Sequence, residues 1–115
     1  MPGTSGTIAV HYALDHTLVE LIGEIDASID MDNAIALDQA TARRARIRVD
    51  LTKNTFLDST GIDFLVRLRR RADEIGVPCD LCNIPDRVTK ILDLLGLGYL
   101  LGGEAEARAP GPAEQ

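Results

Sequence analysis

The chain contains the stretch Phe56-Leu57-Asp58-Ser59-Thr60-Gly61-Ile62, which connects a predicted strand upstream to a predicted helix downstream. Before it, apolar and polar residues alternate over residues 46–51, the pattern of a strand that buries one face. After it, apolar side chains recur every three or four residues from 59 to 75, the pattern of an amphipathic helix. We therefore expect Asp58 or Ser59 to cap this helix by accepting hydrogen bonds from N–H groups of its first turn.

A hydroxyl group at such a junction lies at the positive end of the helix dipole. A phosphate added there would meet several backbone N–H donors, because helix N-termini commonly bind anions. The tetrapeptide Asp-Ser-Thr-Gly at residues 58–61 also fits an ordinary helix cap. It indicates a modification site only in combination with other motifs.

Strand-like and helix-like segments alternate along the rest of the chain. Further strands are expected at residues 8–14, 17–23 and 77–84, and the first two form a hairpin. Further helices are expected at residues 31–44, with Asp30 as the cap, and from Pro85 to Leu95, where Gly96 ends the helix; a short helical turn is expected at residues 99–101.

This order of segments predicts an α/β fold with a four-stranded mixed sheet and three to five helices. Three of the strands would be parallel and joined by right-handed crossovers, with the strand at residues 8–14 antiparallel at the edge. In such sheets the functional crevice lies beyond the carboxyl ends of the parallel strands. The segments after residues 23 and 51 both leave the sheet at that end, so we expect Asp26, Asp58 and Ser59 to share one site.

Several motifs together resemble the STAS family, the anti-sigma factor antagonists of bacteria. The most specific ones are Leu21-Ile22-Gly23-Glu24-Ile25-Asp26, Asp50-Leu51-Thr52, Phe56-Leu57-Asp58-Ser59-Thr60-Gly61 and Leu94-Leu95-Gly96-Leu97. The resemblance runs from about Ile8 to Leu101 and implies a STAS-like fold over residues 8–101. In two places the chain departs from the family pattern: Asn54 replaces a usually apolar residue, and the segment at residues 27–33 is about one residue longer.

The resemblance also implies a function as a phosphorylation switch. The family's phosphoacceptor serine corresponds to Ser59, with Thr60 as the competing hydroxyl. The implied partner is an anti-sigma factor that is also a serine kinase of the GHKL type. The unphosphorylated chain would bind this kinase and release a sigma factor, phosphorylation would abolish binding, and a phosphatase acting on phospho-Ser59 would restore it. The residues expected to bind the partner are Glu24, Asp26, Asp58, Ser59, Thr60 and Gly61.

A glycine within the first turn of a helix is costly, by about 1 kcal/mol relative to alanine. We interpret Gly61 as a position where a side chain would obstruct the approaching kinase. On this interpretation, Gly61→Leu keeps the fold and slows phosphorylation of Ser59.

Two other classes of function are open to the sequence. A STAS-like adaptor whose serine is not switched, in a lipid-transport or stress-signalling assembly, would share the same motifs. A Ser59 nucleophile would need an imidazole base, yet His11 and His16 lie in the first strand and in the turn at the opposite end of the sheet. We therefore expect no enzymatic activity and no cofactor.

The composition narrows the range of partners. The net charge of −6 disfavours nucleic acid, since that binding needs a basic surface, and the arginines are expected on solvated helix and strand faces. No run of 18 apolar residues and no signal peptide is present, so we expect no membrane insertion and a cytoplasmic location. Residues 1–7 are expected to form a flexible N-terminus and residues 102–115 a disordered tail.

The sequence Cys79-Asp80-Leu81-Cys82 has the spacing of a redox or metal motif. It falls within a predicted strand, where residues three apart point to opposite faces. The two sulfurs would therefore diverge, and a zinc site would need two further ligands that the chain does not place nearby. We expect two reduced cysteines with a structural role and no metal site.

Overall fold

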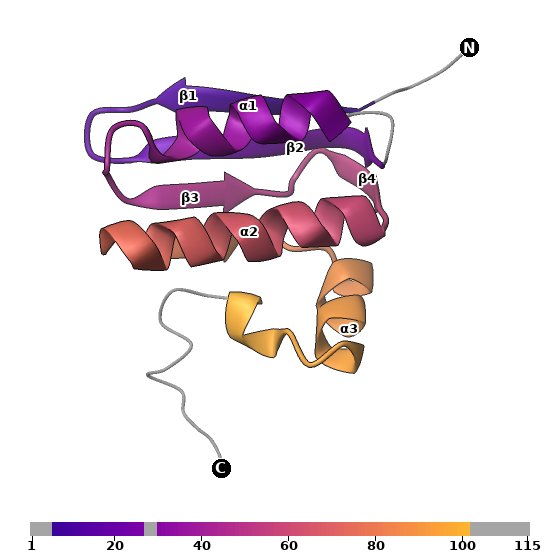
Figure 1. Ribbon diagram of the computed structural model, residues 1–115. Coiled ribbons are helices and arrows are strands. Elements are labelled where there is room, and N and C mark those ends of the chain that lie inside the picture. Colours follow the sequence, from indigo (N-terminus) through magenta and orange to yellow (C-terminus); the bar gives the residue numbers. More distant parts are fainter. Residues whose placement is uncertain (1–5, 27–29, 102–115) are drawn as a thin grey trace.

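The structure, a computed structural model, describes residues 6–26 and 30–101. A mixed sheet forms its centre, and α1 and α2 pack side by side against one face of that sheet (Figure 1). The elements in chain order are β1 (Thr7–Tyr12), β2 (Thr17–Ile25), α1 (Asp30–Thr41), β3 (Ile47–Asp50), β4 (Asn54–Leu57), α2 (Ser59–Ile75), β5 (Cys79–Cys82), α3 (Asp86–Leu94) and the 3-10 helix η2 (Gly98–Leu101).

The predicted α/β topology is confirmed. The main path of the sheet is β1-β2-β3-β5, with β1 antiparallel to β2 and with β2, β3 and β5 mutually parallel. Val19, Val49 and Leu81 occupy adjacent positions across the three parallel strands, and all three are buried under the helices. Burial of such apolar rows is worth about 25 cal/mol per Å² of apolar surface, which makes this layer the main source of stability.

The sheet has a fifth strand that the sequence pattern did not predict. β2 extends to Ile25, beyond the end of β3, so its last residues have no partner on that side until Asn54–Leu57 pairs with them in parallel. The expectation of a loop over residues 52–58 is therefore wrong for residues 54–57. A four-residue segment that begins with a polar residue gives too short a pattern to indicate a strand.

The helix over residues 59–75 has the predicted bounds, and Gly76 ends it with a φ of 75°. The first helix differs from the prediction at both ends. It begins at Asp30, which is therefore inside the helix rather than its cap, and it stops at Thr41 because Arg44 takes a left-handed conformation that leads into β3.

A flexible N-terminus is expected at residues 1–7 and a disordered tail at residues 102–115, yet residues 6 and 7 are part of the described structure. Gly6 is buried and Thr7 begins β1. Residues 1–5 and the predicted tail at 102–115 lie outside the described residues. None of the helices described at residues 30–101 is long and apolar enough to cross a membrane.

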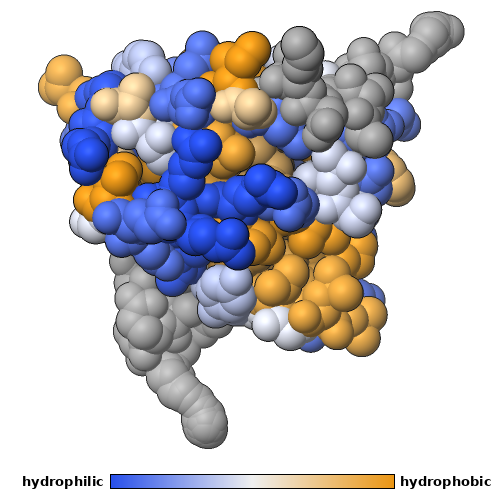
Figure 2. Space-filling view, viewed as in Figure 1, coloured by the Kyte–Doolittle hydropathy of each residue, from blue (hydrophilic) through white to orange (hydrophobic). Residues whose placement is uncertain are grey.

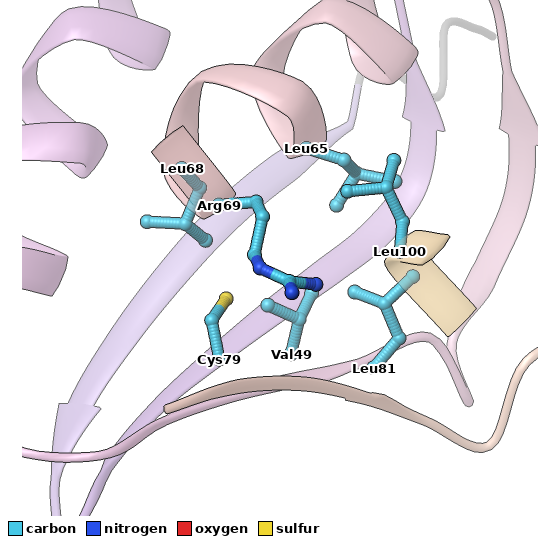
Figure 3. Close-up of a pocket in the computed structure, with 7 residues that line it drawn as sticks. All are labelled: Val49, Leu65, Leu68, Arg69, Cys79, Leu81 and Leu100. Atoms are coloured by element: carbon cyan, nitrogen blue, oxygen red, sulfur yellow. The ribbon is translucent and has the colours of Figure 1, made fainter. Parts of the chain in front are cut away.

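The short helical turn predicted near residue 99 is confirmed as η2, which closes one side of the core. Arg69 of α2 donates a hydrogen bond to the carbonyl of Tyr99 at 3.0 Å and lies over its ring at 5.6 Å. Leu100 then packs toward Leu65 and Leu81, as Figure 3 shows. The enclosed space has no room for a water molecule, so this region is a packed core and not a ligand site.

The two cysteines belong to different surfaces of β5, as predicted. Cys79 is buried, points toward α2 in Figure 3, and burial raises the pKa of its thiol to about 12. Cys82 is half-buried and donates a hydrogen bond to the carbonyl of Val49 at 3.3 Å. Neither cysteine forms a disulfide, and within residues 6–26 and 30–101 no group of three His, Cys, Asp or Glu residues could hold a metal ion.

The solvent face of α2 is strongly hydrophilic, as Figure 2 shows. Arg67 pairs with Asp63 at 2.5 Å, one turn before it on the same helix. Arg71 pairs with Asp38 of α1 at 2.7 Å. These arginines have acidic partners and are in contact with solvent, as expected for a solvated helix face.

Candidate functional site

The pairing of β4 with β2 creates the candidate site. Ile25 and Leu57 are paired across the two strands, and the N–H of Asp58 donates to the carbonyl of Ile25 at 3.2 Å. Asp26 and Asp58 directly follow these paired residues, so both leave the sheet at the carboxyl ends of two parallel strands. Glu24, whose strand partner is Phe56, is exposed near the end of β2, two residues before Asp26. The predicted convergence of the two segments at one end of the sheet is therefore confirmed.

Asp58, and not Ser59, caps α2. Its backbone is extended, with a φ of −97° and a ψ of −167°, and its Oδ1 accepts hydrogen bonds from the N–H groups of Thr60 at 2.8 Å and Gly61 at 3.3 Å. Ser59 is the first helical residue and is exposed, whereas Thr60 is half-buried. The cap therefore leaves the Ser59 hydroxyl accessible to solvent at the positive end of the helix.

Replacing Asp58 by alanine is expected to lower the free energy of unfolding by about 0.5–2 kcal/mol, the usual cost of removing a helix cap. Asp58→Asn should retain most of the stability, because an amide oxygen can accept the same two bonds. Urea denaturation of the three proteins measures the difference. If Asp58→Ala and wild type unfold at the same urea concentration, Asp58 does not act as the cap.

Gly61 lies on the buried side of α2, which contradicts its predicted place on a surface that faces the partner. A Cβ atom built on Gly61 would lie 2.4 Å from Cδ1 of Leu57 and 3.0 Å from Cγ2 of Ile25. Real Cβ atoms essentially never come as close as 2.4 Å to another heavy atom. Close packing of α2 on β4 and β2 therefore accounts for the glycine, and we expect Gly61→Leu to destabilise the fold rather than to keep it.

Phe56 is a site residue that the sequence pattern did not single out. It lies in the segment between the predicted strand at residues 46–51 and the predicted helix, and its side chain is 48% exposed. It lies two residues before Asp58 and opposite Glu24. An exposed aromatic side chain beside a candidate modification site is a common feature of docking surfaces.

Asn54 is a buried polar residue at the start of β4, and hydrogen bonds satisfy its side chain. Asn54 is only 5% exposed, and its Nδ2 donates to the carbonyls of Gly23 at 3.0 Å and Phe56 at 2.9 Å. Arg87 of α3 donates from Nη2 to the carbonyl of Asn54 at 2.6 Å and to its Oδ1 at 3.1 Å. The buried amide therefore has hydrogen bonds at both ends, and no sequence spacing indicated the contribution of Arg87.

A second polar cluster rigidifies the turn that leads into β4. Oδ1 of Asp50 accepts hydrogen bonds from the N–H and hydroxyl of Thr52, at 2.9 and 2.6 Å, and from Nδ2 of Asn83 at 3.1 Å. Burial tends to raise the pKa of the Asp50 carboxyl, but these hydrogen bonds outweigh it and the pKa is lowered. The carboxylate thus stays charged and ties the end of β3 to the end of β5.

The sequence model of one family, the STAS domain, matches residues 7–104. This chain belongs to the STAS domain family. The match includes every strand and helix from β1 to η2, and the family resemblance carried by the motifs is confirmed. No curated protein matches the sequence.

Solved structures of STAS proteins have a similar fold. An anti-sigma factor antagonist from Mycobacterium paratuberculosis is 22% identical with a TM-score of 0.69, over 84% of this chain and 83% of that one. The anti-sigma factor antagonist SpoIIAA in its unphosphorylated form is 16% identical with a TM-score of 0.64, over 76% and 83%. The phosphorylated form of SpoIIAA from Bacillus is 20% identical with a TM-score of 0.61, over 83% and 88%. At these identities the similarity shows the fold alone.

Proposed function

We propose that this STAS domain is an anti-sigma factor antagonist whose binding is switched off by phosphorylation of Ser59. The observation that carries the proposal is the exposed Ser59 hydroxyl at the first position of α2, with the capping role taken by Asp58. A kinase can reach this hydroxyl without unfolding the helix. The solved structures with similar folds, which include an antagonist in phosphorylated and unphosphorylated forms, support the same class of function.

The local charges favour a switch that acts on docking and not on folding. A phosphate adds about −1.5 to −2 charges at the N-terminus of α2, where the helix dipole stabilises an anion. At the docking surface, however, it would add to the charge of the exposed Glu24 and of the half-buried Asp26 and Asp58. A partner that buries this surface would have to desolvate the added charge, and a penalty of about 3 kcal/mol weakens binding more than a hundredfold.

The proposed partner is an anti-sigma factor serine kinase of the GHKL type, located with this chain in the cytoplasm. Binding of the unphosphorylated chain would displace a sigma factor from this kinase, and a phosphatase acting on phospho-Ser59 would reset the switch. The exposed ring of Phe56 would provide an apolar contact at the centre of the docking surface, within a ring of polar side chains.

The positions of the histidines support a binding role rather than catalysis. His16 lies in the turn between β1 and β2, at the opposite end of β2 from Asp58, and its Nδ1 is 2.7 Å from the carboxylate of Asp15. His11 lies within β1 and its Nε2 is 2.9 Å from the carboxylate of Glu20. With a rise of about 3.3 Å per residue along β2, His16 is too far from Ser59 to act as its base.

Ser59→Ala is expected to abolish phosphorylation of the chain while it changes the free energy of unfolding by less than about 0.5 kcal/mol, since the side chain is exposed and Asp58 provides the cap. Thr60→Ala is the matched control, because it removes the neighbouring hydroxyl and should leave phosphorylation intact. Each variant is produced from the native locus, and the phosphorylated fraction is measured by mass spectrometry of the intact protein. Phosphorylation that survives Ser59→Ala and disappears in Thr60→Ala would move the switch to Thr60.

A further inference from the structure

We infer that Arg87 is a positioning residue for the Ser59 site, because its guanidinium holds β4 and the cap that follows it in place against β2. The functional part of this inference, an effect of Arg87 on the phosphorylation of Ser59, rests on the proposed function. The structural part, a side chain of α3 that anchors the strand before the site, stands on the hydrogen bonds around Asn54.

β4 needs an anchor because it has little support of its own. The strand has four residues, lies off the main path of the sheet, and among the described residues it pairs only with residues 23–25 of β2. The register shifts between Gly23 and Glu24, which interrupts the regular ladder of hydrogen bonds at the start of the pairing. A short strand beside such an irregularity opens at low cost unless side chains hold it.

The Asn54 amide replaces the missing ladder bonds. Its Nδ2 donates to the carbonyl of Gly23 on β2 and to the carbonyl of Phe56 on β4, so it joins the two strands at the irregular position. An apolar side chain at this position could not make either bond. In this chain the start of β4 therefore depends on how the Asn54 side chain is oriented.

Arg87 fixes that orientation from outside the sheet. One nitrogen, Nη2, donates to both oxygen atoms of Asn54, that of the side chain and that of the backbone. With the oxygen held by the guanidinium, the amide nitrogen must face Gly23 and Phe56. Hydrogen bonds from a charged donor are stronger than those between neutral groups, so Arg87 is a firm anchor for β4.

The anchor acts on Ser59 through the chain itself. Asp58 lies four residues after Asn54; its N–H donates to the carbonyl of Ile25 and its carboxylate caps α2. If β4 detaches at Asn54, the bond between Asp58 and Ile25 and the two cap bonds lose their support. Ser59 would then be presented to the kinase in many orientations instead of one, at a cost to catalysis.

The test compares Arg87→Ala with the control Lys90→Ala, which removes a positive charge from the same helix. Lys90 is exposed, and its side chain makes no hydrogen bond or ion pair with other described residues. Hydrogen exchange measured by NMR is expected to be about tenfold to a hundredfold faster at the N–H groups of Asp58 and Thr60 in Arg87→Ala. Exchange at Val49 and Leu81 of the main sheet should remain as in wild type, and Lys90→Ala should change none of these rates.

Arg87→Lys keeps the charge and can make only part of the bonds, so its exchange rates should fall between those of wild type and Arg87→Ala. This variant also serves if Arg87→Ala does not fold. Asn54→Leu should have the same local effect, and adding Arg87→Ala to it should bring little further change, since both belong to one network. Equal exchange at Asp58 and Thr60 in wild type, Arg87→Ala and Arg87→Lys would overturn the inference.

The functional consequence is measured with the serine kinase that co-purifies with the wild-type chain from its cells. Arg87→Ala is expected to lower kcat for phosphorylation of Ser59 by about tenfold with less change in KM, because the docking surface remains while the hydroxyl is misaligned. Faster local exchange with unchanged phosphorylation kinetics would overturn the positioning role. Failure of wild type itself to be phosphorylated would instead overturn the proposed function, and the exchange measurements would still decide whether Arg87 anchors β4.

Discussion

Gly61→Leu is expected to lower the free energy of unfolding by about 3 kcal/mol or more, because a core without free space must move to admit four additional carbon atoms. Cβ alone would overlap Leu57 and touch Ile25, and both of these side chains are already buried. Even Gly61→Ala should destabilise, although alanine is favoured over glycine in a helix by about 1 kcal/mol. The sign of the alanine effect therefore separates packing from helix propensity.

Urea denaturation followed by circular dichroism measures both Gly61 variants. Arg70→Leu is the matched control, since it places a leucine on the exposed face of the same helix and should change stability by about 0.5 kcal/mol or less. Wild-type stability in Gly61→Leu would contradict the close packing of α2 on β4. It would also reopen a role for Gly61 at the partner surface.

Ser59→Asp is expected to fold normally and to bind the anti-sigma factor at least about tenfold more weakly than wild type, since it adds a charge to the docking surface. The exposed position at the helix N-terminus tolerates a carboxylate, so stability should be equal or slightly higher. The effect should be smaller than that of true phosphorylation, because a carboxylate has one charge and two oxygen atoms.

Calorimetric titration of the co-purifying anti-sigma factor with unphosphorylated wild type, Ser59→Asp and Ser59→Ala measures this difference at fixed nucleotide and salt concentration. Ser59→Ala is the neutral control and should bind about as well as wild type. Ser59→Asn further separates charge from size, because asparagine has the shape of aspartate without its charge. Equal affinity of wild type and Ser59→Asp would favour an adaptor that is not switched.

The sequence predicts the long and regular elements of this fold well, and it misses the short one that builds the site. Segments 46–51 and 59–75 have clear periodicity, and the parallel arrangement follows from their alternation. β4 forms because β2 is longer than β3 and leaves backbone groups unpaired. The cause is the difference in length between two strands that lie far apart along the chain, so no local sequence pattern can indicate β4.

The same distinction applies to the site residues. The place of Asp58 and Ser59 at a helix start follows from the local pattern, and the structure decides between them by the hydrogen bonds of the cap. The close packing of Gly61 was not predicted, because the local pattern does not show that this side of the helix contacts Leu57. No local pattern indicates Arg87, since it contacts Asn54 from 33 residues away along the chain.

The most direct test of the switch is the intact mass of the chain recovered from its native cells, followed by mapping of the modified residue. We expect a fraction of the protein to have one added phosphate, located on Ser59, and we expect this fraction to change with growth conditions and to disappear in Ser59→Ala. Recovery of unmodified protein under every condition, or a single phosphate on Thr60 or another residue, would contradict it.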